Sequence, residues 1–393
     1  MTATSTVPSS ESPRIEALDV LRGIAILGTL ASNIWIFAAF IGSSGDPVTP
    51  EPITVAAAWL PNGKFLGLLT IMFGIGIEIQ RQAARRAGRS WPGTYPIRAG
   101  LLFLDGLLNY VFVVQFDVLR AYAVTGLIVA FLLLTSERVQ WWVIGIMIPL
   151  HLSMLVMKGT VLPSGPAKQT ISMPSDGSLS GAQPSSYWDD VVGNLTHIGA
   201  GFSFGSEFFT IILMGVGLFL LGANLYRLGI FEPRRRILRR WLMVAGFAIG
   251  VPLDAFFAFV APADSGGALA RYGAAPIVAI GILAAVAEFY QQRRPGRIGR
   301  SLAAVGKMAL SCYLLQNILG VIFQKNSASL PLFAEMDGLL GTLGLFAIIS
   351  VALVAFARLW SRRFRRGPFE LIWDWCYRAL TRRRESAPAA RPA

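Results

Sequence analysis

The sequence is poor in charge, in histidine and in cysteine. Charged residues make up 15% of its 393 residues, whereas an ordinary soluble domain carries roughly 25%. Two cysteines and two histidines are too few for a disulfide framework, and they lack the spacing of a zinc site. We therefore expect no metal ion and no disulfide-rich module.

Long apolar stretches take the place of the missing charges. Apolar residues make up 54% of the chain, and glycine occurs 40 times. About 20 apolar residues in a row can cross the ~30 Å hydrocarbon core of a membrane as a helix. The sequence therefore predicts an all-α, polytopic membrane helix bundle rather than a soluble enzyme. We expect ten spans, at about 17–41, 64–81, 97–115, 117–135, 139–157, 206–227, 238–261, 270–291, 301–324 and 338–360.

The placement of Lys and Arg predicts the orientation. The net charge of +13 would suggest a nucleic-acid partner in a soluble chain, but here the positive residues lie in short segments between spans. With the amino terminus inside, 27 of the 35 Lys and Arg residues fall in cytoplasmic segments and 5 in outer ones. Because such residues favour the cytoplasmic side, we expect a cytoplasmic-membrane protein with both termini inside and no nucleic-acid partner.

The predicted spans divide the chain into five and five. We expect the following parts: a disordered tail 1–13, a first membrane half 14–157, an outer loop 158–205, a second half 206–360, an amphipathic helix 361–384 and a disordered tail 385–393. An odd number of spans in each half would invert the second half, as in transporters with inverted repeats. The amphipathic helix places Phe369, Ile372, Trp373, Cys376 and Leu380 at helical spacing between arginines, which is typical of a helix on the inner leaflet.

Ionisable residues within spans are costly and are therefore candidate site residues. In the first span, Asp19 and Arg22 are spaced for an ion pair, and Asn33 follows on the face of Arg22, about 16 Å further out. Asp105 and Asn109 share a face of the third span, and Asp117 and Arg120 can pair at the start of the fourth. The other candidate binding residues are Lys64, His151, Lys307, Tyr313 and Gln316.

Four segments resemble YeiB-like bacterial membrane proteins, the domain-of-unknown-function family 418. They are LDVLRGIAILGTLASN (18–33), FDVLRAYAVTGL (116–127), GKMALSCYLLQN (306–317) and GPFELIWDWCYRAL (367–380). The resemblance implies a distant relationship to transmembrane acyltransferases, which pass an acyl group from a cytoplasmic donor to an outer acceptor. In the O-acyltransferase-3 group an Arg of the first span is followed, after ten residues, by a His; here that position is Asn33. The YeiB-like family usually has a second His at the position of Asn109.

Three hypotheses remain open. The first is an atypical acyltransferase of the cell envelope, in which Arg22 holds an anionic donor such as acyl-CoA, while Asn33 and Asp117 orient a lipid or glycan acceptor. The second is a transporter or lipid-handling protein that keeps the scaffold without acyl transfer. The third is a structural partner that works as a homodimer, because glycine-rich spans can pack closely. Membrane lipids are expected partners in all three.

Overall fold

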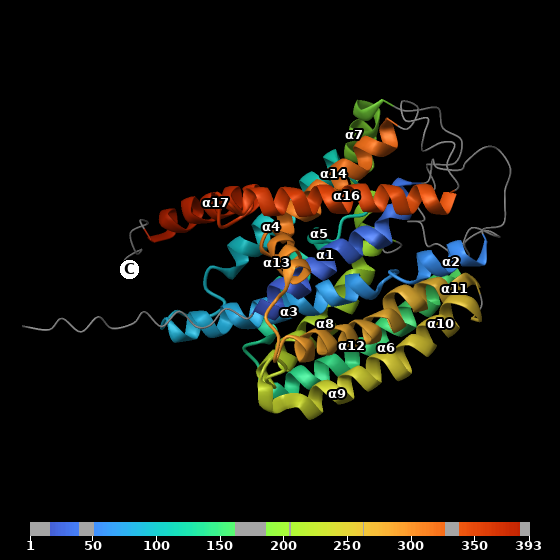
Figure 1. Cartoon of the computed structure of the whole chain (residues 1–393). Helices are drawn as coiled ribbons and strands as arrows, with labels where there is room; N and C mark the ends of the chain where they lie inside the picture. Colours follow the sequence, from blue (N-terminus) through green and yellow to red (C-terminus); the bar gives the residue numbers. More distant parts are fainter. Residues whose placement is uncertain are drawn as a thin grey trace, which may run out of the picture.

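The computed structural model describes residues 16–38, 51–161, 186–203, 206–261, 263–326 and 338–385, and within these ranges all regular structure is helical (Figure 1). The predicted tail 1–13, the predicted tail 385–393 except for Glu385, and most of the predicted outer loop lie outside the described residues. The helix bounds are α1 Glu16–Phe37, α2 Pro52–Trp59, α3 Lys64–Arg86, α4 Tyr95–Phe112, α5 Leu119–Leu132, α6 Glu137–Val161, α7 Tyr187–Thr196, α8 Glu207–Arg227, α9 Arg236–Val244, α10 Val251–Phe259, α11 Ala263–Ala268, α12 Ala275–Phe289, α13 Arg297–Lys307, α14 Ala309–Lys325, α16 Gly338–Trp360 and α17 Pro368–Glu385.

Four short helical turns complete these elements. Two are 3-10 helices, η1 Ile198–Phe202 and η2 Pro233–Arg235. The other two are π-helical turns, η3 Ala245–Gly250 and η4 Leu269–Ala274, and they join α9 to α10 and α11 to α12. Such π-helical turns often occur at functional sites.

A helix lies at each of the ten predicted places, but fewer qualify as membrane spans. Seven segments of the described chain are long and apolar enough, or eight if the bent pair α13 and α14 counts as one span. α4 is not among them because it carries Arg98, Asp105 and Asn109 within 18 residues, and α5 is apolar but has only 14 residues. Length and composition therefore support a multi-pass helical protein with about seven spans.

The predicted span 301–324 is divided between two helices. α13 and α14 meet at an angle of 89°, and Met308 between them leaves the helical conformation, with φ −120° and ψ 41°. α13 carries Arg297, Arg300 and Lys307 opposite an apolar face, so it packs across α1 while its charges stay exposed. A helix with this charge pattern has a lower free energy at a polar boundary than inside hydrocarbon.

The core forms around α1, α3 and α8, which run between α16 and α9 in Figure 1. Two glycines let α3 and α8 approach closely. A Cβ at Gly74 would lie 2.0 Å from the carbonyl oxygen of Phe219, and one at Gly222 would lie 2.2 Å from that of Ile71. Such contacts between small residues are typical of membrane helix pairs. Helices of both predicted halves thus share one core.

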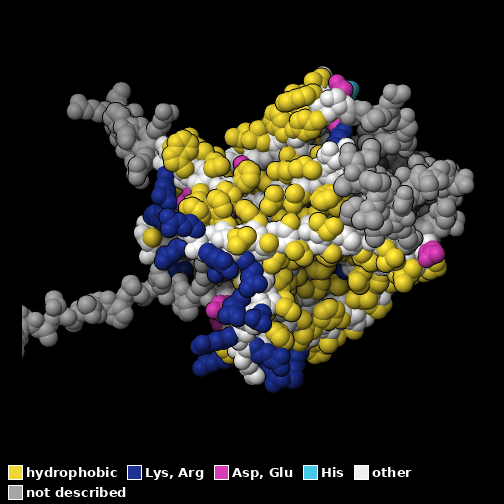
Figure 2. All heavy atoms as spheres, turned by 45° about the horizontal axis from the view of Figure 1, so that its top comes forward, with side chains coloured by type: hydrophobic (Ala, Val, Ile, Leu, Met, Phe, Trp, Pro, Cys, Tyr) yellow, Lys and Arg dark blue, Asp and Glu magenta, His cyan; other side chains and the backbone are white. Residues whose placement is uncertain are grey.

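The outer helices expose apolar side chains instead of burying them. Trp142 on α6, Trp241 on α9 and Val351 on α16 are each more than two-thirds exposed. Figure 2 shows hydrophobic side chains over the middle of the molecule and Lys and Arg gathered at one end. Exposed arginines occur where α8 leads to α9, where α12 leads to α13 and where α16 leads to α17, at 234–236, 293–300 and 362–366.

Candidate functional site

A buried ion pair lies where α4 turns into α5. The Asp117 carboxylate lies 3.7 Å from Nε of Arg120 and accepts a hydrogen bond from the Arg120 backbone amide at 3.1 Å. Asn109 Nδ2 donates to Asp117 Oδ1 at 3.0 Å, and the Tyr313 hydroxyl of α14 donates to the same oxygen at 3.4 Å. Asp117 and Arg120 therefore pair as their spacing predicts, and a distant helix completes the group.

Gly106 makes this arrangement possible. It lies on α4, one turn before Asn109, and a Cβ there would be 2.5 Å from Asp117 Oδ2 and 2.6 Å from the Arg120 backbone nitrogen. Because α4 has no side chain at this point, the beginning of α5 packs directly on its backbone. The short connection of residues 113–118 then holds Asp117 within reach of Asn109.

The Arg120 guanidinium lies between aromatic rings. Its centre is 3.9 Å from the ring centroid of Tyr110 and 5.1 Å from that of Phe202, in the range of cation–π attraction. Phe202 ends η1, which follows α7. Asn194 of α7 donates to the Val111 carbonyl at 3.1 Å, so this part of the predicted outer loop is folded and packs over the ion pair.

α14 adds a row of buried amides to the site. Tyr313, Gln316 and Asn317 share one face of α14 and are at most 4% exposed. Neither amide atom of Gln316, nor of Asn317, has a hydrogen-bond partner among the described residues, and the same holds for Asn109 Oδ1 and for Nε and Nη1 of Arg120. Each unmatched buried group costs roughly 1–3 kcal/mol. We call Asn109, Asp117, Arg120, Tyr313, Gln316 and Asn317 the α4–α5–α14 cluster.

Packing between α1 and α14 brings Asn33 to the level of this cluster. Gly320 of α14 lies against the ring of Phe37, and that ring contacts Phe116 at a centroid distance of 5.7 Å. One turn back, about 6 Å along each helix, are Asn33 on α1 and Gln316 on α14. Asn33 is half-buried.

Arg22 lies about three turns from Asn33, near the start of α1. Its Nη1 lies 3.9 Å from Asp19 Oδ1, and its guanidinium lies close to the position that a Cβ would take on Gly76 of α3. The Arg22 side chain remains partly exposed while Asp19 is buried. The first helix thus presents a cation near the arginine-rich end and an amide beside the cluster.

Of two other predicted candidates, Asp105 lies next to the cluster and Lys307 lies outside it. Asp105 is half-buried on α4, one turn before Asn109, and its Oδ2 has no hydrogen-bond partner among the described residues. Lys307 ends α13 at the bend before α14 and is exposed. Asp105 therefore borders the cluster, whereas Lys307 does not contribute to it.

Lys64 and His151 belong to a second polar group, around η4. Lys64 lies 2.6 Å from Asp254 of α10, and Arg271 of η4 donates to Asn62 Oδ1 at 2.8 Å. His151 Nε2 is 3.1 Å from the Tyr272 carbonyl oxygen. These side chains hold one another and the π-helical turn together. Neither His151 nor His197, which caps the end of α7, contacts Asp117.

The amphipathic tail helix docks beside α4 and α14 through its first turn. Glu370 accepts hydrogen bonds from the backbone amides of Leu310 and Ser311, at 2.9 and 3.2 Å, and one from the Ser311 hydroxyl. Its carboxylate therefore caps the first turn of α14, where the chain bends. No sequence signal pointed to this contact, because 59 residues separate Glu370 from Ser311.

Further along α17, two aromatic rings face Arg98 of α4. The guanidinium lies 5.5 Å from the Trp373 ring and 4.5 Å from the Tyr377 ring, while the Tyr377 hydroxyl is 2.5 Å from that of Thr94. Burial raises the pKa of Tyr377, but its hydrogen bonds with Thr94 and Arg98 outweigh that effect and leave the pKa below 10. Trp373 thus faces the protein, whereas Ile372 of the same predicted apolar face is exposed.

Comparison with known proteins finds one matching family. A family model described as "Protein of unknown function (DUF418)" matches residues 225–381. This part of the chain resembles the DUF418 family. It is 28% identical over 380 residues to the uncharacterized protein YeiB of Escherichia coli (strain K12), covering 91% of this chain and 94% of that protein. It is 25% identical over 393 residues to the uncharacterized protein YxaH of Bacillus subtilis (strain 168), covering 93% and 94%.

The DUF418 match covers only part of the cluster. It includes α14 and α17, and therefore Tyr313, Gln316, Asn317 and Glu370. Asn109, Asp117 and Arg120 lie before it, within the part of the chain that YeiB and YxaH also match. The YeiB-like resemblance of four separate segments is therefore supported over most of the chain.

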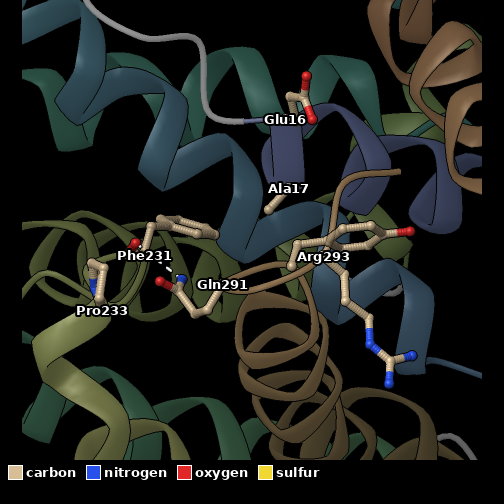
Figure 3. A pocket seen from close by; sticks show the side chains of 7 residues that line it. Glu16, Ala17, Phe231, Pro233, Gln291 and Arg293 are labelled. Atoms are coloured by element: carbon tan, nitrogen blue, oxygen red, sulfur yellow. Dashed lines mark hydrogen bonds between the residues drawn. The ribbon is translucent and has the colours of Figure 1, made fainter. Parts of the chain in front are cut away.

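The arginine-rich end of the bundle contains a pocket of 280 Å³, lined by Glu16, Ala17, Phe231, Pro233, Tyr290, Gln291 and Arg293 (Figure 3). The Gln291 amide is engaged there by the Phe231 carbonyl oxygen, at 3.1 Å. None of the cluster residues lines this pocket. It is thus a separate surface feature at the end of α12.

Two familiar site types are not built in the described ranges. No three His, Cys, Asp or Glu side chains there lie close enough to share a metal ion. Residues 201–205 have the letters of a GxSxG elbow, which requires a strand before the serine and a helix after it. Here Phe202 ends a 3-10 helix and covers Arg120. The sequence pattern is therefore present without the strand that the elbow requires before the serine.

Proposed function

We propose that this chain is an atypical transmembrane acyltransferase that acts on a lipid or glycan of the bacterial cell envelope. The observation that supports it best is the Asp117–Arg120 pair, buried in a cluster with unmatched hydrogen-bonding groups. A carboxylate, a guanidinium and a phenol in one buried site can hold an acceptor hydroxyl and stabilise charge on a reacting carbonyl.

The proposed chemistry uses the residues of the cluster in separate roles. Asp117 takes the proton of the acceptor hydroxyl, and the acceptor oxygen forms a bond to the carbonyl carbon of an acyl thioester such as acyl-CoA. Arg120 donates to the developing oxyanion. The carbon–sulfur bond then breaks, and the departing thiolate takes up the proton from Asp117. Asp117 thereby replaces the histidine that the O-acyltransferase-3 group has where Asn33 stands.

The donor enters, on this proposal, from the side of Arg22. That residue is a partly exposed cation at the arginine-rich end, suited to a phosphate or carboxylate of the donor. Asn33, about three turns away on the same helix, would then contact the acceptor. On this proposal the ten predicted spans, α4 and α5 among them, cross the cytoplasmic membrane with both termini inside. The gathering of arginines at one end of the bundle supports this orientation.

A deletion strain and single variants test the proposal. Asp117→Asn keeps the shape of the side chain but removes its ability to accept a proton, and we expect an acyl group on an envelope lipid or glycan to fall at least 100-fold. Arg22→Gln should raise the donor concentration required. Thr342→Val, a buried change on α16 away from the cluster, serves as control. An unchanged acyl profile in the deletion strain would contradict the proposal.

A transporter is the second candidate, favoured by the broken helix pair. The 89° bend between α13 and α14 and the two π-helical turns interrupt helices as in transporters, where broken helices build midplane sites. Flux of an envelope metabolite into proteoliposomes without covalent change would favour this function. Acyl transfer by the purified protein would favour the first.

A further inference from the structure

The unmatched groups of the α4–α5–α14 cluster include both donors and acceptors. Gln316 and Asn317 each present a free amide NH₂ and a free amide oxygen, Asn109 adds an oxygen, and Arg120 adds Nε and Nη1. All four residues are at most 3% exposed. These buried side chains of α4, α5 and α14 therefore carry hydrogen-bonding groups that the described protein itself does not match.

The mixture of donors and acceptors selects the chemistry of a ligand. Phosphodiester and carboxylate groups accept hydrogen bonds only, so they would leave the amide oxygens of Asn109, Gln316 and Asn317 unmatched. An ammonium group donates only and would leave the NH₂ groups unmatched. A hydroxyl group both donates and accepts. Several neighbouring hydroxyls on one molecule would match this set.

Charge in the cluster points the same way. The carboxylate of Asp117 offsets the Arg120 guanidinium, which lies 3.7 Å away. Asp105 borders the cluster with a further carboxylate. The cluster therefore has no excess positive charge to attract an anion, in contrast to the arginine-rich end of the molecule.

We propose that the α4–α5–α14 cluster binds a neutral polyhydroxyl group, such as a sugar ring or polyol headgroup, and that Gln316 and Asn317 recognise its hydroxyls. This inference rests on the proposed function, because it names the acceptor class of the same cluster. Tyr313, on the same face of α14 as these amides, adds its hydroxyl to the group.

The test uses the full chain in nanodiscs and two lipid probes with the same acyl chains. Monoglucosyl dioleoylglycerol carries a neutral sugar, and dioleoylphosphatidylglycerol carries an anionic phosphate. Native mass spectrometry measures the affinity of each probe. We expect at least tenfold tighter binding of the glucosyl lipid. Equal affinity, or tighter binding of phosphatidylglycerol, would overturn the inference without any variant being needed.

Two variants then place the bound lipid. Gln316→Met and Asn317→Leu keep side-chain volume but remove the amide groups, and each should weaken glucosyl-lipid binding at least tenfold while binding of phosphatidylglycerol stays unchanged. Thr342→Val, which alters a buried hydroxyl bonded within α16 to the Gly338 carbonyl, is the matched control. Undiminished glucosyl-lipid binding in both folded amide variants would overturn the inference.

The result also separates this inference from the proposed function. Selective glucosyl-lipid binding that depends on Gln316 and Asn317, without acyl transfer in any assay, would support the inference and contradict the acyltransferase. Acyl transfer to an anionic headgroup, with no preference for the glucosyl lipid, would support the acyltransferase and contradict the inference.

Discussion

Lys64 Nζ lies 2.6 Å from Asp254 Oδ2, and both side chains are almost completely buried. Lys64 also donates to the Trp59 carbonyl at 2.9 Å and lies over the Trp59 ring. The pair thus ties the turn between α2 and α3 to α10, next to the π-helical turn η4. Trp59 ends α2, Lys64 begins α3 and Asp254 lies on α10, so the ion pair joins three helices.

Removing one member of that pair should be worse than removing both. Lys64→Met or Asp254→Leu leaves a buried charge without its partner and should lower the free energy of unfolding by about 3–5 kcal/mol. The double variant should recover much of this loss. Unfolding by SDS in mixed micelles measures it. Additive losses in the double variant would contradict a direct ion pair.

A methyl group at Gly106 should displace the cluster. Gly106→Ala places a Cβ 2.5 Å from Asp117 and 2.6 Å from the Arg120 backbone, and overpacking of this kind costs about 1–3 kcal/mol. We expect a parallel loss, at least tenfold, in acyl transfer or lipid binding. Gly100→Ala is the control on the same helix, because a Cβ there meets nothing within 4 Å. Equal behaviour of the two variants would contradict this role of Gly106.

Glu370 should hold the tail helix against α14. Glu370→Gln removes a charged acceptor from two backbone amides and should loosen α17 by about 1–3 kcal/mol. Hydrogen exchange of residues 368–381 measures the change. Asp374→Asn alters an exposed pairing with Arg366 and Arg378 and should shift exchange by less than about 1 kcal/mol. The same exchange in both variants would mean that the cap does not hold the helix.

Cysteine labelling tests the orientation. Thr196→Cys on α7 and Ser361→Cys after α16 both introduce exposed thiols, in a background with Cys376→Ser. A membrane-impermeant maleimide added to intact inner-membrane spheroplasts should label the first variant and reach the second only after lysis, because arginine-rich segments favour the cytoplasm. The reverse pattern would show the opposite orientation.

Local spacing predicted the pairs that lie within a single helix or turn. Asp19 with Arg22, and Asp117 with Arg120, are three residues apart and lie 3.9 and 3.7 Å from each other. Helix geometry alone brings such residues together. The same reasoning placed one span at 301–324 but gave no sign of the break within it. Composition does not show that Glu370 caps a new helix start at Ala309.

The sequence by itself determined that the chain is helical and multi-pass, because apolar stretches of about 20 residues, separated by arginines, have few other stable arrangements in a membrane. Only the tertiary structure decided which polar residues meet. Tyr313 reaches Asp117 across 196 residues, and Asn33 stands at the level of Gln316 because Gly320 packs on Phe37. Contacts of this kind depend on how helices cross and on where glycine allows them to approach. These are properties of packing that no single stretch of sequence contains.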